Sequence, residues 1–217
     1  AIAREQGVLF HTDAVQAAGK IPIDVEDLGV DLLSLSAHKF HGPKGVGALY
    51  VRSGVKLSPL IHGGGQERGL RAGTENVPSI AGFGKAAELA IGNLEEAGRI
   101  QASRDRLEAG VRSLVPGANV NGDANQRLPN TLNLTLPGLR GESVVVAMDR
   151  HGVSLSSASA CKSGSPDPSH VLLAMGNTAS DAHCAVRFSL SIDTTEQDIE
   201  DTVAALAEVL EEMETTI

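Results

Sequence analysis

Aromatic residues are rare in this chain, which has four Phe, one Tyr and no Trp among its 217 residues. The core must therefore be built mainly from Leu, Val, Ile and Ala, a composition that suits helices packed on a sheet. The length is sufficient to bury a core, either in one large domain or in two small ones.

Cysteine is also rare, since Cys161 and Cys184 are the only two. Two cysteines cannot form a disulfide framework, and a reducing compartment suits them best. The sequence shows no signal peptide and no apolar run long enough to cross a bilayer. We therefore expect a cytoplasmic protein that does not associate with a membrane.

Basic residues are outnumbered, because 18 Lys and Arg against 27 Asp and Glu give a net charge of -9. Without a dense basic cluster, direct binding of nucleic acid is not expected. The patterns C-x-x-C and H-E-x-x-H are missing, so we expect no metal site. Residues 42–47 lack the spacing of a phosphate-binding loop and precede an expected strand, which argues against a nucleotide fold.

Lys39 stands where an apolar segment, residues 32–35, runs into a turn rich in glycine. A lysine held at a fixed point can bind an aldehyde cofactor such as pyridoxal phosphate covalently. Asp13 follows another apolar segment, residues 8–10, and this cofactor needs an anion beside its pyridinium nitrogen. Both residues would lie at carboxyl ends of strands, where open α/β sheets bind ligands. Considered alone, Lys39 fits a solvated loop lysine better.

The hydrophobic pattern predicts an α/β protein with a domain boundary near Asn93. Before this boundary we expect buried strands at residues 8–10, 32–35 and 46–51, followed by a long functional loop at 63–76. A helix is expected at 79–91, with helical spacing of the apolar residues Ile80, Phe83, Ala87 and Ile91.

Beyond the boundary the pattern predicts a helix at 102–114 and a smaller α/β unit with strands at 130–136, 153–156 and 185–191. A helix between the first two strands should start at Gly141 and stop before Gly152. The last helix should begin with a capping box of Thr194 and Gln197. Its apolar stripe, which we interpret as core, consists of Ile199, Val203, Leu206, Leu210 and Met213.

Two residues of the second half are candidates for chemistry. Cys161 lies beside Lys162 in a run of small polar residues, a setting that exposes a cysteine and favours its thiolate. A small buried residue is the alternative for any cysteine, and we interpret Cys184 in this way. Arg187 lies in an apolar strand, where a guanidinium needs either a substrate carboxylate or an internal acidic partner.

Six sequence blocks occur in one order along the chain. They are HTDAVQAAGK at 11–20, SAHK at 36–39, GPKGVGALY at 42–50, HGGGQER at 62–68, RAGTEN at 71–76 and SAC at 159–161. Together they resemble the cysteine desulfurases of the NifS/IscS type, with selenocysteine lyases as close relatives. The resemblance covers essentially the whole chain, and several blocks in order are far more specific than any one of them.

The resemblance implies the fold of the pyridoxal phosphate-dependent transferases of fold type I. Residues 1–92 would form the C-terminal part of the large, cofactor-binding domain, and residues 93–217 a small α/β domain with the loop of Cys161. The N-terminal half of such proteins is absent from this sequence. That half supplies a glycine–threonine turn for the cofactor phosphate and a side chain that stacks on the pyridine ring.

The resemblance also assigns roles to residues of this chain. Lys39 would bind the cofactor and then act as the base, while Asp13 would pair with the pyridinium nitrogen. Cys161 would attack the sulfur of the substrate, and Arg187 would bind the substrate carboxylate.

Four further residues are implied in cofactor binding. Gln16 would bond the phenolic oxygen of pyridoxal phosphate, and Ser36 and His38 its phosphate. Thr74 would reach the phosphate from the other subunit, which implies a homodimer.

The implied activity is the conversion of L-cysteine to L-alanine, with the sulfur left as a persulfide on Cys161. An iron–sulfur scaffold or a sulfur-carrier protein would accept that sulfur. Selenocysteine lyase activity is an alternative. An alternative of another class is an inactive fragment, or a scaffold or binding subunit that needs the missing N-terminal half.

Overall fold

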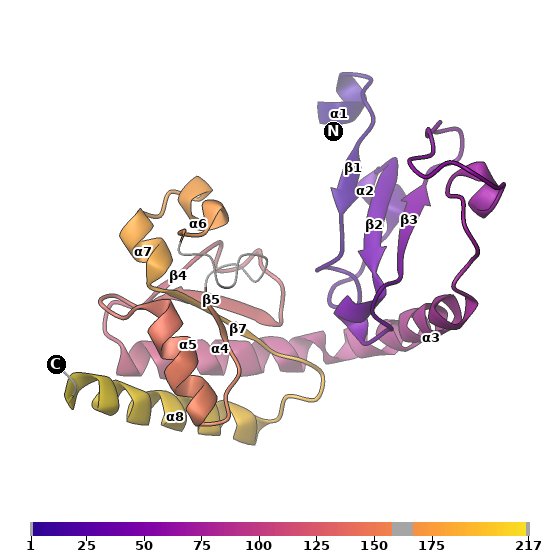
Figure 1. Ribbon diagram of the computed structural model, residues 1–217. Helices are drawn as coiled ribbons and strands as arrows, with labels where there is room; N and C mark the ends of the chain where they lie inside the picture. Colours follow the sequence, from indigo (N-terminus) through magenta and orange to yellow (C-terminus); the bar gives the residue numbers. More distant parts are fainter. Residues whose placement is uncertain (1, 158–166, 216–217) are drawn as a thin grey trace. The chain divides into compact units, whose positions relative to one another are not determined.

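The computed structural model describes residues 2–157 and 167–215. The chain divides into two compact units, Ala1–Glu95 and Glu96–Ile217 (Figure 1). The division falls within the short helix η3 (Leu94–Glu96). Within the described residues, no helix is both long and apolar enough to cross a membrane.

The first unit contains a three-stranded sheet in the order β1-β2-β3. Strands β1 (His11–Asp13) and β2 (Leu32–Ser36) are parallel, and β3 (Gly47–Val51) is antiparallel to β2. The remaining elements are α1 (Ile2–Glu5), α2 (Val25–Leu28), η1 (Ala37–Phe40), η2 (Glu67–Gly69) and α3 (Val77–Asn93). The loop expected at 63–76 therefore contains one short helical turn, η2.

The strand predicted at residues 8–10 is wrong, because these residues are exposed and the paired strand β1 starts only at His11. The helix α2 ends in Gly29 with a left-handed backbone (φ 62°), and β2 starts only at Leu32. The carbonyl of Phe10 accepts from the backbone N–H groups of Asp31 and Leu32, so pairing begins at this point. The expectation of buried strands is also wrong for β1 and β3, whose side chains are largely exposed.

The helix α3 confirms the prediction for 79–91 but uses a different face. Asn76 caps its first turn by accepting from the N–H of Ser79 at 3.3 Å. Its buried residues are Ala86 and Ala90, whereas Ile80 and Ile91 are exposed. Small side chains lie on the buried face because the helix packs closely against Ala18 and Phe40.

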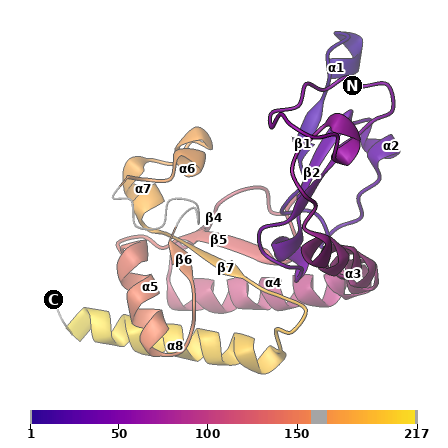
Figure 2. The same ribbon diagram turned by 45° about the vertical axis from the view of Figure 1, so that its right-hand side comes forward.

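The second unit contains an antiparallel sheet in the order β4-β5-β7-β6. Its strands are β4 (Asn119–Val120), β5 (Thr131–Thr135), β6 (Ser156–Ser157) and β7 (Ala185–Ser189). Its helices are α4 (Ala97–Leu114), α5 (Gly141–Arg150), α6 (His170–Ala174), α7 (Ala179–His183) and α8 (Glu196–Thr215). The long helices α4 and α8 run side by side next to the sheet (Figure 2).

The helices predicted at 102–114 and from Gly141 are confirmed, as are the strands within 130–136 and 185–191. The strand predicted at 153–156 is reduced to Ser156 and Ser157, because only these two residues pair with β7. Val153 and Leu155 instead pack against the core from irregular backbone.

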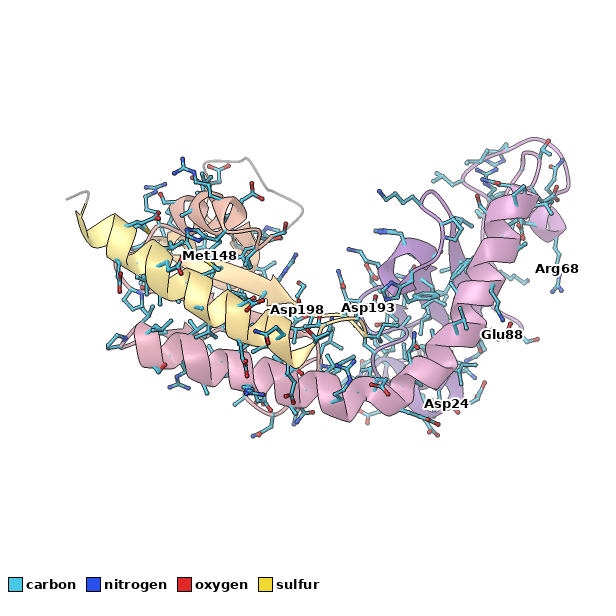
Figure 3. The ribbon with its side chains drawn as sticks, turned by 90° about the horizontal axis from the view of Figure 1, so that it is seen from below. Asp24, Arg68, Glu88, Met148, Asp193 and Asp198 are labelled. Carbon is cyan, nitrogen blue, oxygen red and sulfur yellow. The ribbon has the colours of Figure 1, made fainter. Side chains whose placement is uncertain are left out.

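The apolar stripe predicted for the last helix is confirmed, since all five of its residues belong to or pack against the main core. Its capping box is wrong by one residue. The N–H of Thr195 donates to the carboxylate of Asp198 at 2.8 Å, and the N–H of Asp198 donates to the hydroxyl of Thr195 at 3.1 Å. The hydroxyl of Thr194 instead accepts from the N–H of Ser191 at 2.9 Å. Figure 3 shows Asp193 and Asp198 on either side of this turn into α8.

Candidate functional site

The carboxyl ends of β1 and β2 form the candidate site of the first unit. Because these strands are parallel and paired from His11 with Leu32 to Asp13 with Ser34, their ends lie at the same edge of the sheet. Asp13 is the last residue of β1, and β2 continues directly into η1, which carries His38 and Lys39. Such an edge is where open α/β sheets bind ligands.

Asp13 is held in a defined orientation. Its carboxylate oxygen Oδ1 accepts from the N–H of Val15 at 2.9 Å, a local turn typical of aspartate after a strand. The N–H of Ala14 donates to the carbonyl of Ser34 at 3.1 Å and so ties this turn to β2. Gln16 lies exposed on the same turn.

Lys39 is half-buried on η1, and close backbone packing defines the position of this turn. The residue after η1, His41, adopts a left-handed backbone (φ 69°). A Cβ atom at Gly42 would lie 2.9 Å from the carbonyl oxygen of Ala37, so only glycine fits there. Ser36 precedes η1 at its N-cap, but its side chain makes no capping hydrogen bond.

Lys20 is a residue of this edge that the sequence patterns did not single out. Its ammonium Nζ donates to the carbonyl oxygen of Lys39 at 3.2 Å. Burial, and to a smaller extent the positive charge of Lys39, lower the pKa of Lys20. The sequence block 11–20 ends at this residue, but nothing in the block indicates a contact with η1.

Thr74 lies exposed in the segment between η2 and α3. This segment is shaped by hydrogen bonds from the N–H of Gly73 to the side chain of Gln66, at 3.2 Å, and from the N–H of Ala72 to the carbonyl of Ile61. Glu67 and Arg68 both have left-handed backbones. The role of Thr74 in a second subunit stays a prediction.

Arg187 is the candidate of the second unit. It lies on β7 between Asn133 of β5 and Ser156 of β6. Its Nη2 donates to the hydroxyl of Ser156 at 3.4 Å, while its Nε is buried and has no acceptor among the described residues. An unsatisfied buried donor is costly, so this guanidinium is suited to an additional anionic partner.

Cys161, the predicted nucleophile, lies outside the described residues. Cys184 is a half-buried free cysteine directly after α7, and its carbonyl accepts from the N–H of Leu136 at 2.9 Å. No three His, Cys, Asp or Glu side chains gather as metal ligands would in 2–157 and 167–215.

The fold of this chain is that of the pyridoxal phosphate-dependent transferases of fold type I. Solved structures with this fold include a NifS-like protein, with a TM-score of 0.87 and 42% identity over 97% of this chain and 55% of that chain. A NifS-like protein from Rickettsia africae gives a TM-score of 0.88 and 36% identity over 97% of this chain and 56% of the other. The chain belongs to the aminotransferase class-V family, whose model matches residues 1–202.

The curated relatives carry a more specific name. A cysteine desulfurase of Gluconacetobacter diazotrophicus is 54% identical over 92% of this chain and 50% of its own length. The cysteine desulfurase IscS of Clostridium botulinum is 48% identical over 97% of this chain and 54% of its own length. The chain thus spans about half the length of the curated relatives that it matches.

Proposed function

We propose that this chain supplies the cofactor-binding lysine, the carboxylate-binding arginine and the sulfur-accepting cysteine of a cysteine desulfurase. The observation that carries the proposal is the placement of Asp13 and Lys39 at adjacent ends of parallel strands. The names of its relatives support the activity. A solved structure of SspA in complex with cysteine is also similar to this chain, with a TM-score of 0.65 and 38% identity over 87% of this chain and 52% of the other.

The residues of the first unit fit pyridoxal phosphate by their chemistry. Lys39 offers an amine, Asp13 an oriented carboxylate, and Ser36 a hydroxyl that η1 does not use for capping. His38 and Gln16 add exposed polar groups at the same edge. When bound, the cofactor withdraws electrons from the substrate and so makes its α-proton removable.

Each residue then has a defined task. Asp13 keeps the pyridine nitrogen protonated, because a carboxylate favours the positive charge beside it. The amine of Lys39 takes up the α-proton of the substrate and returns a proton to the product. Arg187 binds the substrate carboxylate, which supplies an acceptor of the kind that its Nε lacks.

Cys161 takes the sulfur in this proposal. Its thiolate attacks the sulfur of L-cysteine, so that an S–S bond forms and the Cβ–S bond of the substrate breaks. The electron pair of the broken bond stays with the carbon skeleton, which is protonated to give L-alanine. The persulfide on Cys161 is then available to an iron–sulfur scaffold or a sulfur-carrier protein.

Three further parts belong to the proposal. Thr74 reaches the cofactor of a second copy, so the working protein is a homodimer. The compartment is the cytoplasm, where thiols such as Cys161 stay reduced. Turnover of selenocysteine is the competing activity, since selenium and sulfur differ little in size.

The test compares two cysteine variants of the chain. With pyridoxal phosphate and L-cysteine supplied, Cys161→Ala should abolish alanine formation and the persulfide adduct, whereas Cys184→Ala should retain both. Alanine formation unaffected by Cys161→Ala would contradict the mechanism. Retained turnover of selenocysteine in that variant would favour a selenocysteine lyase. No alanine from the unaltered chain would favour the alternative of an inactive fragment, or of a scaffold or binding subunit that needs an N-terminal half.

A further inference from the structure

Lys20 approaches the backbone of Lys39 because Gly19 permits close packing. Gly19 has a left-handed backbone (φ 72°), and a Cβ atom there would lie 3.0 Å from the Cβ of Phe40 and 3.2 Å from that of Ala90. The turn after β1 therefore lies directly against the residue that follows Lys39. Within this turn, the backbone N–H of Lys20 donates a hydrogen bond to the carbonyl of Ala17 at 3.0 Å.

The contact falls at a point of η1 where the backbone needs a donor. The last carbonyl groups of a helical turn have no partner within the turn, and lysine side chains commonly satisfy them. The start of η1 is fixed by Ala37, whose N–H donates to the carbonyl of Val46 at 3.1 Å and whose carbonyl accepts from the N–H of Gly42 at 2.9 Å. The ammonium of Lys20 adds a hydrogen bond to the carbonyl of Lys39 itself, at 3.2 Å.

Lys20 differs in burial from a surface lysine such as Lys85. Lys85 pairs with Glu88 at 2.8 Å and its side chain is 60% exposed. Lys20 is half-buried, and burial lowers its pKa, with a smaller contribution from Lys39. A lysine held in this way beside another lysine costs free energy, which its hydrogen bond to the turn offsets in part.

We infer that Lys20 is a positioning residue, which holds the η1 turn through the carbonyl of Lys39 and thereby directs the Lys39 amine at the sheet edge. The inference rests on the proposed function for the role of Lys39. It does not require that Lys20 touch the cofactor or the substrate.

The test uses Lys20→Met, which keeps the apolar stem and removes the donor, with Lys20→Arg as the conservative variant and Lys85→Met as the matched control. The chain is incubated with pyridoxal 5′-phosphate, reduced with borohydride at intervals and mapped by peptide mass. Lys20→Met should slow labelling of Lys39 about fivefold, the factor that corresponds to one lost hydrogen bond. Labelling of other lysines should not change, and Lys20→Arg should restore the rate. An unchanged rate in Lys20→Met, or no recovery in Lys20→Arg, overturns the inference.

Amide hydrogen exchange separates this inference from the proposed function. The N–H groups of His41 and Gly42 close η1 on the carbonyl of Ala37. In Lys20→Met they should exchange about fivefold faster than in the unaltered chain, whereas Lys85→Met and Lys20→Arg should leave them unchanged. Unlabelled Lys39 in the unaltered chain would contradict the proposed function. Hydrogen exchange at His41 and Gly42 would still test the role of Lys20. Equal exchange rates in Lys20→Met and in the unaltered chain would overturn that role.

Discussion

The two units differ in how they are held together. In the second unit one continuous cluster contains seventeen buried residues, most of them from α4, α5, α8 and the sheet. In the first unit the two main clusters contain four and three, and fourteen of the eighteen exposed large apolar side chains in the described residues lie there. Since each buried large apolar side chain contributes about 1.5–3 kcal/mol, the second unit is the more stable one.

The unit with the larger core is not the unit that carries the candidate cofactor-binding residues. The edge with Asp13 and Lys39 lies on the unit with the smaller core, where backbone hydrogen bonds and glycine contacts set the geometry. The second unit offers Arg187 from the middle of a well-packed sheet. We expect the first unit to open at a lower free energy than the second.

The largest effect should come from a truncation in the larger core. Leu206→Ala removes a fully buried side chain of α8 and should destabilise the second unit by about 2–5 kcal/mol. Leu33→Ala is the matched change in the first unit, and it should cost less, about 2 kcal/mol, because the cluster that contains Leu33 is much smaller. Hydrogen exchange measured separately for the two units gives both costs, and equal costs would contradict the inference that the second unit is the more stable one.

Smaller effects on stability, opposite in sign to each other, should come from replacing two helical glycines by alanine. In the second unit, a Cβ atom at Gly110 of α4 would lie 2.6 Å from Cγ2 of Val203 on α8. Gly110→Ala should therefore cost about 1–3 kcal/mol. In the first unit, Gly84 of α3 has open space around it, so Gly84→Ala should stabilise that unit by up to about 1 kcal/mol. Denaturant unfolding of both variants measures the two signs, and a stabilising Gly110→Ala would contradict the close packing of α4 and α8.

The capping of α8 should contribute about 1 kcal/mol. Thr195→Ala removes the hydroxyl that accepts from the N–H of Asp198 and should destabilise the second unit by about 0.5–2 kcal/mol. Gln197→Ala is the control and should change stability by less than about 0.5 kcal/mol. A larger cost for Gln197→Ala would favour the capping box that the sequence pattern suggested.

The smallest effect should be a pH dependence at the same helix end. Hydrogen bonds from the N–H of Thr195, and then from its hydroxyl, hold the pKa of Asp198 below its usual value of 3.8. A lowered folded-state pKa gives stability that is present above 3.8 and is lost as pH falls through the folded value. Asp198→Asn should therefore lower the thermal midpoint at pH 6 and have less effect at pH 3. An equal effect at both pH values would exclude this contribution of the ionised carboxylate.

The sequence predicted best those elements whose own periodicity decides their packing. The helix α8 is twenty residues long and its apolar stripe meets one large core, so the spacing of the stripe was sufficient to predict it. The capping box was displaced by one residue because Thr194 and Thr195 are chemically alike and only the backbone decides which hydroxyl faces the helix. Short elements such as α6 and α7 carry too few residues for a period to be visible.

For the candidate site, the sequence predicted that Asp13 and Lys39 lie at carboxyl ends of strands. The structure adds that β1 and β2 are parallel neighbours, which places these ends at one edge. The sequence misplaced the first strand at residues 8–10. The pairing of β1 with β2 depends on where the chain leaves α2 to enter β2, which the pattern of residues 8–10 does not contain. The sequence patterns also passed over Lys20, because a contact with the backbone of Lys39 leaves no mark in residue types.

Whether Lys39 binds the cofactor is tested most directly by the intact mass of the chain before and after borohydride reduction with pyridoxal 5′-phosphate, followed by peptide mapping. We expect a single pyridoxyl adduct on Lys39 that is lost in Lys39→Ala and retained in the neighbouring Lys44→Ala. An adduct that persists in Lys39→Ala, or that maps to another lysine, would contradict this expectation.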